Sequence, residues 1–189
     1  MKSRILVAMA PALFAGVFFL AIGAHAGDDG EDSLLKGLPS TKHSLVDGIR
    51  QATKDGGVAI SAKFEDEGKG LSLSVYVAAK GLSAKAEENT LEELAGSPTG
   101  AEWKPEAEVF EDVEHVARSA EQLTLMRLTS LSLADAIARA ERAQKGNVIS
   151  VIPGIRGSKP VFHVRIAADG KVADVLLDLM SGEPVVKAG

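Results

Sequence analysis

The chain has 189 residues, no cysteine and a formal net charge of −5. Nucleic acids and anionic membranes attract clusters of Lys and Arg, so this acidic balance argues against both as partners. Without disulfides the protein has to be stabilised by an apolar core, and its length is enough for one domain or two small ones.

Residues 1–26 have the three parts of an export signal. Lys2 and Arg4 form a basic start, an apolar run follows, and Ala24-His25-Ala26 fits the small-x-small cleavage rule. We expect cleavage between Ala26 and Gly27, which places the mature protein in the periplasm or outside the cell, with no remaining membrane contact. The apolar run is longer than an ordinary signal core, so an uncleaved anchor is the alternative.

Residues 27–42 open with the acidic sequence GDDGEDS, which has no apolar anchor. This composition predicts a solvated, flexible linker. The alternative, a calcium loop, lacks the alternating Asp/Asn ligands and the later Glu of an EF-hand.

The clearest unit covers residues 130–187. Leu133, Ile137 and Ala140 recur at helical spacing after the capping residue Ser132, and Lys145-Gly146 ends the predicted helix. Three segments with β-branched or alternating apolar residues follow, separated by turn dipeptides: Val148–Ile152, Phe162–Ile166 and Val175–Leu179. The pattern predicts one helix packed across a three-stranded antiparallel sheet.

A looser unit at residues 43–103 has the same order of parts. Its helix start, SLVDGI from Ser44, matches SLADAI from Ser132 at an offset of 88 residues, and its second predicted strand and Lys80-Gly81 turn match at 89. The agreement predicts an internal repeat. The third strand of this unit, within Ala84–Leu94, is weakly signalled and could be partly helical.

Residues 104–129 are expected to connect the two units. Apolar residues at helical spacing, with Pro105 in the first turn, predict a helix over roughly Pro105–Leu125 whose apolar stripe packs on a sheet; a partner-binding helix is the alternative. The predicted fold class is therefore α+β, with two helix-on-sheet units joined by a connecting helix.

No set of residues indicates catalysis. Cysteine is absent, and His43, His115 and His163 belong to three different predicted elements, so we expect no enzyme, no catalytic residue and no cofactor. Glu111, Glu114 and His115 are weak candidates for metal ligands, since Glu111 and His115 would share a helical face, but no further ligand is identifiable. A periplasmic metal- or small-ligand-binding protein is therefore the alternative function.

The second unit resembles the PepSY domain family in its helix start, in the strand VFHVRI and in the ending from Asp178 to Glu183, DLMSGE. The resemblance covers residues 130–184 well and Ser44–Gly96 weakly. It implies an exported or membrane-linked α+β module without catalytic residues, for which protein binding or peptidase inhibition has been proposed. The expected partner is thus a peptidase or another exported protein or peptide, held at a sheet edge or face. Asp178 and Gly182 are expected to form the turn after the last strand.

Overall fold

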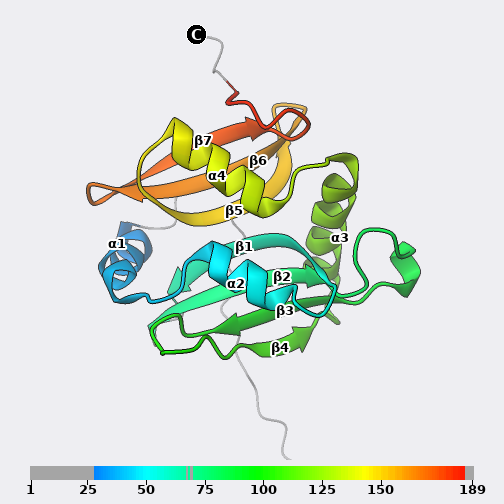
Figure 1. Ribbon diagram of the computed structural model, residues 1–189, viewed down its shortest axis with the longest axis horizontal. Coiled ribbons are helices and arrows are strands. Elements are labelled where there is room, and N and C mark those ends of the chain that lie inside the picture. Colours follow the sequence, from blue (N-terminus) through cyan, green and yellow to red (C-terminus); the bar gives the residue numbers. More distant parts are fainter. Residues whose placement is uncertain (1–27, 67, 69, 186–189) are drawn as a thin grey trace, which may run out of the picture.

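Seven strands of the computed structural model form one continuous antiparallel sheet, in the order β4-β3-β2-β1-β5-β6-β7 (Figure 1). The strands are β1 (Val58–Asp66), β2 (Leu71–Ala78), β3 (Leu91–Gly96), β4 (Glu106–Val109), β5 (Asn147–Arg156), β6 (Lys159–Ala168) and β7 (Lys171–Asp178). The structure describes residues 28–66, 68 and 70–185, so the predicted signal segment lies outside the described residues. No helix within these ranges is long and apolar enough to span a membrane.

Within the described residues, four α-helices and two short 3₁₀ helices accompany the sheet. They are α1 (Asp28–Gly37), η1 (Leu38–Ser40), α2 (Leu45–Ala52), η2 (Ala86–Glu88), α3 (Val113–Leu128) and α4 (Leu133–Ala143). The predicted α+β class, with one helix and a set of strands in each unit, is confirmed. The unit boundaries given above stay predictions.

The two units share local details at positions where their sequences match. Both α2 and α4 begin with a reciprocal capping box: Ser44 pairs with Asp47, and Ser132 pairs with Asp135. Each first strand also has an irregularity at the corresponding place, between Ala59 and Ser61 in β1 and between Val148 and Ser150 in β5. Each helix packs on strands of its own unit and also contacts the first strand of the other unit, α2 on β5 and α4 on β1.

One difference from expectation is that the units share a sheet. Strand β1 pairs with β5 through Ala62 opposite Val151 and Lys63 opposite Ser150. Ala62 and Val151 are fully buried. The first strand of each unit would otherwise be an exposed edge, and their pairing removes both edges at once.

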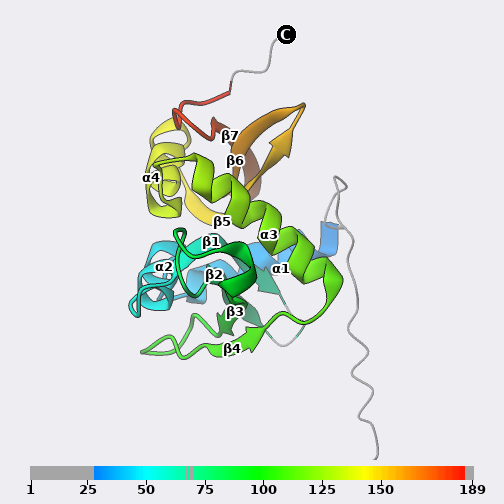
Figure 2. The same ribbon diagram turned by 90° about the vertical axis from the view of Figure 1, so that its right-hand side faces the viewer.

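Helices cover both faces of this sheet. Figure 1 shows α2 and α4 side by side on one face, where Gly48 of α2 lies against Leu73 of β2. Phe64 of β1 is paired with Leu73, and Ser61, three residues away, points to the opposite face. There Ser61 donates a hydrogen bond to Gln122 of α3 at 2.8 Å. Helix α3 runs alongside both units, and α1 lies behind the sheet (Figure 2).

The expected linker at residues 27–42 is wrong over most of its length, because residues 28–40 form α1 and η1. Leu34 and Leu38 are buried in the core. Glu31 accepts a hydrogen bond from Arg165 of β6 at 2.5 Å. These contacts come from distant parts of the chain and stabilise a helix that the local composition does not favour.

The connecting helix also differs from expectation. Residues Glu106–Val109 form β4, which pairs with β3, and α3 begins at Val113 rather than near Pro105. The Asp112 carboxylate caps α3 by accepting from the His115 amide at 3.0 Å. Acidic residues after a proline are typical of a helix start, but here the alternation Glu-Ala-Glu-Val follows strand geometry instead.

Candidate functional site

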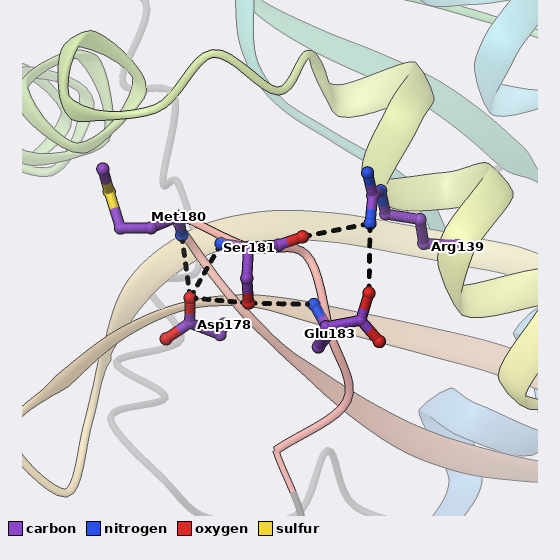
Figure 3. Close-up of polar contacts among 5 residues, drawn as sticks. All are labelled: Arg139, Asp178, Met180, Ser181 and Glu183. Carbon is purple, nitrogen blue, oxygen red and sulfur yellow. Dashed lines mark hydrogen bonds and ion pairs between the residues drawn. The ribbon is translucent and has the colours of Figure 1, made fainter.

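The family-like ending Asp178–Glu183 forms a tight turn after β7 (Figure 3). The Asp178 carboxylate accepts hydrogen bonds from the Met180 amide at 3.0 Å, the Ser181 amide at 2.9 Å and the Ser181 hydroxyl at 3.0 Å. These donors favour the ionised carboxylate; the Ser181 amide is the main cause, and the pKa of Asp178 is lowered.

Gly182 closes this turn in the left-handed region, with φ +69°. Its amide donates to the Asp178 carbonyl at 2.8 Å. Arg139 of α4 fixes the turn to the helix by donating to the Ser181 carbonyl at 3.0 Å and by pairing with Glu183 at 3.6 Å. The turn-forming role expected for Asp178 and Gly182 matches this geometry.

The turn returns the chain to the outer edge of β7. The Asp178 amide donates to the Glu183 carbonyl at 2.8 Å, and the Val185 amide donates to the Leu176 carbonyl at 2.7 Å. The end of the PepSY-like motif thus covers part of one edge of the sheet.

Asp178→Ala is expected to lower the melting temperature at pH 7, because three donors lose their acceptor. Since the folded-state pKa of Asp178 is lowered, its contribution is present above pH 4 and is lost as pH falls below the ordinary aspartate pKa. Thermal melts followed by circular dichroism should therefore show a large difference from the parent at pH 7 and a smaller one at pH 3. An equal difference at both pH values would contradict this role.

The three histidines expected to be non-catalytic lie far apart in the fold. His43 contacts the Gly100 carbonyl at 3.2 Å, His115 contacts Asp112 at 2.7 Å, and His163 of β6 contacts Asp174 of β7 at 2.8 Å. Each is thus held by its own local partner, and they do not form a common site.

The weak metal candidates are not arranged as the sequence suggested. Glu111 precedes α3, whereas Glu114 and His115 lie in its first turn, so Glu111 and His115 do not share a helical face. His115 instead bonds Asp112 and stacks on Phe110, with ring centroids 5.1 Å apart. Within the described part of the chain, no group of three or more His, Asp or Glu residues is placed to hold a metal ion.

Strand β4 is the outermost strand of the sheet on the side of β3. All four of its residues are exposed. The Phe110 amide donates to the Leu91 carbonyl at 3.1 Å. Because peptide groups along an antiparallel strand point alternately toward and away from the neighbour, the N–H and C=O groups of Ala107 and Val109 point outward. Among the residues that the structure describes, no strand pairs with these outward groups, so β4 offers an open backbone edge.

A surface pocket of about 1080 Å³ lies beside this edge. Its floor includes residues of β2, β3 and β4 that share one sheet face, and its wall includes Ser40 of η1 and Lys104. Three carboxylates line it: Glu93, Glu106 and Glu108. Glu93 and Glu108 are directly opposite each other across the β3–β4 pair, an arrangement in which like charges repel. We refer to this feature as the acidic pocket.

An aromatic stack supports the acidic pocket from within. Tyr76 of β2 stacks on Phe110 with ring centroids 5.6 Å apart, and its hydroxyl hydrogen-bonds the Glu93 carboxylate. The Lys63 ammonium lies 5.3 Å from the centre of the Tyr76 ring. Burial, followed by the charge of Glu93, raises the pKa of Tyr76 well above its ordinary value. The stack joins the segment after β4 to the sheet and so fixes the edge strand in place.

The stability of the protein is expected to fall as pH rises above about 10, the ordinary tyrosine pKa. Below that pH Tyr76 is protonated in both the folded and unfolded states; above it only the unfolded state readily loses the proton. Urea unfolding between pH 8 and pH 11 measures the loss. Tyr76→Phe should make the alkaline decline shallower than in the parent, and an unchanged decline would show that Tyr76 is not its source.

Sequence reasoning missed the acidic pocket because it assigned Glu106–Val109 to a helix. The available signal was the period-two alternation of these four residues. The remaining information, that β4 has only one neighbour, depends on the strand order and could not be obtained from local patterns.

Residues 130–185 match the family model PepSY, described as "Peptidase propeptide and YPEB domain". No curated protein matches the chain. Among solved structures, the chain is similar to a "putative lipoprotein" from Clostridium difficile 630, with 16% identity over 77% of this chain and 92% of that one, and a TM-score of 0.38. The matched residues comprise α4, the three strands β5 to β7 and the Asp178–Glu183 turn, so this part of the chain is a PepSY domain.

Proposed function

We propose that this chain is an exported, non-catalytic protein that binds an extended segment of another polypeptide along strand β4. The observation that carries the proposal is the edge itself: four exposed residues, with two outward-pointing peptide units, beside a pocket of about 1080 Å³. An extended peptide can add to such an edge, with its backbone hydrogen bonds providing affinity and the adjoining pocket providing specificity.

The other edge of the sheet is less accessible. Part of β7 is covered by residues 183–185, which hydrogen-bond its outer side. By contrast, β4 is the last strand of the sheet at its end of the strand order. The difference between the two ends supports β4 as the docking strand.

Export and the nature of the partner follow from other observations. The signal-like residues 1–26 support a periplasmic or secreted location. The second unit belongs to a family whose description names peptidase propeptides, so an exported peptidase is the first partner to test. Binding of a peptidase segment along β4 would modulate that enzyme without any catalysis by this chain. The matching details of the two units further support our inference that they arose by duplication.

The test is a titration of the isotope-labelled protein with short unstructured peptides of differing charge, followed by backbone amide resonances. The amides of Ala107 and Val109 should shift, because they gain hydrogen bonds. Ala107→Pro removes one outward N–H without removing a bond to β3, so it should weaken binding by about tenfold while the melting temperature stays close to the parent value.

Val172→Pro is the matched control at the other edge. Val172 lies on β7, where its peptide group points away from β6. The Val172→Pro variant should bind the peptides as tightly as the parent protein does. Loss of binding in Val172→Pro but not in Ala107→Pro would move the site to β7, and the absence of binding by every peptide would overturn the proposed function.

A further inference from the structure

The two faces of β4 differ in chemistry, and this difference restricts what can pair with it. By strand alternation, the side chains of Glu106 and Glu108 are on the face that borders the acidic pocket, and those of Ala107 and Val109 are on the other face, although Ala107 also lines the pocket. A strand paired beside β4 has its own side chains on the same two faces, directly opposite those of β4. The side chains of β4 therefore determine which type of residue is favoured at each position of the incoming segment.

The charges of Glu106 and Glu108 are the next feature of the pocket side of β4. Within the described residues, no Lys or Arg forms an ion pair with Glu106 or Glu108. The one basic residue that lines the pocket, Lys104, is 3.5 Å from Glu102, an acid outside the pocket lining. Glu93 adds a third carboxylate opposite Glu108. Cationic side chains from a partner would relieve this repulsion.

The opposite face of β4 favours apolar partners. Val109 is 51% exposed, and Ala107 beside it carries no charge. Apolar side chains of an incoming strand would lie against these two residues and remove their apolar surface from water. The two faces together specify alternation of basic and apolar residues.

We propose that the segment bound along β4 is an extended peptide in which Lys or Arg alternates with aliphatic residues. The basic side chains face Glu106 and Glu108, and the aliphatic ones face Ala107 and Val109. This inference rests on the proposed function and narrows it to one class of partner. A second copy of the chain is disfavoured at this edge, because β4-to-β4 pairing would bring four glutamates together.

The experiment uses fluorescence anisotropy with three labelled peptides of equal length. One alternates Lys with Val, one alternates Glu with Val, and one has the composition of the first with all Lys residues in one block and all Val residues in another. The first should bind, and its affinity should fall as salt is raised, since the charges are near the surface. The glutamate peptide should not bind, and the block peptide should bind more weakly, because it cannot place its charges on one face of a strand.

A double variant, Glu106→Gln with Glu108→Gln, tests whether these two carboxylates contribute to peptide affinity. The double variant should bind the Lys–Val peptide about tenfold more weakly, the effect expected of two solvent-accessible ion pairs. Glu121→Gln with Glu141→Gln is the control: it changes the net charge equally at exposed positions of α3 and α4, and it should leave the affinity unchanged.

The outcomes separate this inference from the proposed function. If the glutamate or the block peptide binds as well as the alternating basic one, or if the Glu106/Glu108 variant keeps full affinity, the charge pattern is wrong. In each of these cases Ala107→Pro still decides whether the edge binds peptides. If none of the three peptides binds, both the inference and the proposed function fail.

Discussion

Ile137→Asp is expected to unfold the entire described sheet, although the substitution lies in the second unit only. Ile137 is on the buried face of α4 and is 2% exposed. An aspartate there loses the apolar burial of the isoleucine and places an unpaired charge in the core, at a cost of about 4 kcal/mol or more. Typical domains are stable by only about 5–15 kcal/mol, so most of the stability is lost.

The unfolding should include the first unit because the two units share a sheet. The junction between β1 and β5 includes Ala62 and Val151, both with no exposed surface. Loss of the second unit exposes this apolar seam and leaves β1 as an open edge. Cooperative loss of both units is therefore expected rather than melting of the PepSY domain alone.

The fluorescence of the single tryptophan reports whether the first unit unfolds together with the second. Trp103 belongs to the first unit, is 1% exposed and donates from its ring nitrogen to the Gly96 carbonyl at 3.2 Å. In Ile137→Asp its fluorescence should shift to that of a solvated indole, in parallel with the loss of circular dichroism. A native-like Trp103 signal in this variant would show that the first unit folds alone and that the β1–β5 junction is weak.

Ala138→Asp is the matched control. Position 138 is the next residue in α4 and is exposed, so it accepts the same new charge without burying it. The expected cost is about 0.5–1 kcal/mol, mainly from the lower helix propensity of aspartate. If the two variants melt alike, the buried face of α4 has been assigned incorrectly.

Features determined by neighbouring residues could be predicted from the sequence. The helix starts at Ser44 and Ser132 depend on a side chain that bonds an amide three residues away. The turn at Asp169-Gly170 requires two residues tolerant of positive φ, and both adopt it, at +52° and +72°. In these places local chemistry and tertiary structure agree, and the prediction is correct.

Features that depend on distant partners were not predictable in the same way. Helix α1 is held by Leu34 in the core and by the Glu31–Arg165 pair, which joins residues 134 positions apart. Strand β4 exists because β3 offers it an edge. Local composition favours a linker in the first case and a helix start in the second, and tertiary pairing overrides both preferences.

Strand β2 illustrates a subtler limit. Its alternation of apolar residues with serines predicts one solvated face, yet every residue of β2 is buried. The serine-bearing face is covered in the fold, and the Ser74 hydroxyl is buried without a hydrogen-bond partner among the described residues. The alternation therefore predicts on which face of the sheet each side chain lies, but not whether other parts of the chain cover that face.

The functional candidates also divide into a feature set by neighbouring residues and one set by residues distant in the sequence. The Asp178–Glu183 motif, which the sequence marks most clearly, stabilises a turn through bonds within six residues. The acidic pocket, which supports the proposed function, is assembled from strands that are adjacent only after folding. The residues that identify the family and those proposed to bind a partner are thus different, and they lie in different units.

Gly146→Ala is expected to destabilise the protein by about 3 kcal/mol, or lower the melting temperature by roughly 10 °C. Gly146 follows α4 with φ +146°, a conformation that residues with a Cβ rarely adopt. An added Cβ would lie 2.4 Å from the Ala167 carbonyl oxygen and 2.5 Å from Ile166 Cγ2. The oxygen belongs to the backbone of β6, so relief requires β5 and β6 to move apart.

Two other glycines separate the contribution of the collision from that of the backbone conformation. Gly56 follows α2, one residue before the position that corresponds to Gly146, and has φ +95°; nothing lies within 4 Å of an added Cβ, so Gly56→Ala should cost only about 1 kcal/mol of conformational strain. Gly154, in β5, has neither positive φ nor a close neighbour, and Gly154→Ala should be nearly neutral. Thermal melts of the three variants should rank them in this order. Equal effects of Gly146→Ala and Gly56→Ala would mean that β6 gives way easily and that the close approach of Gly146 to Ala167 adds no constraint of its own.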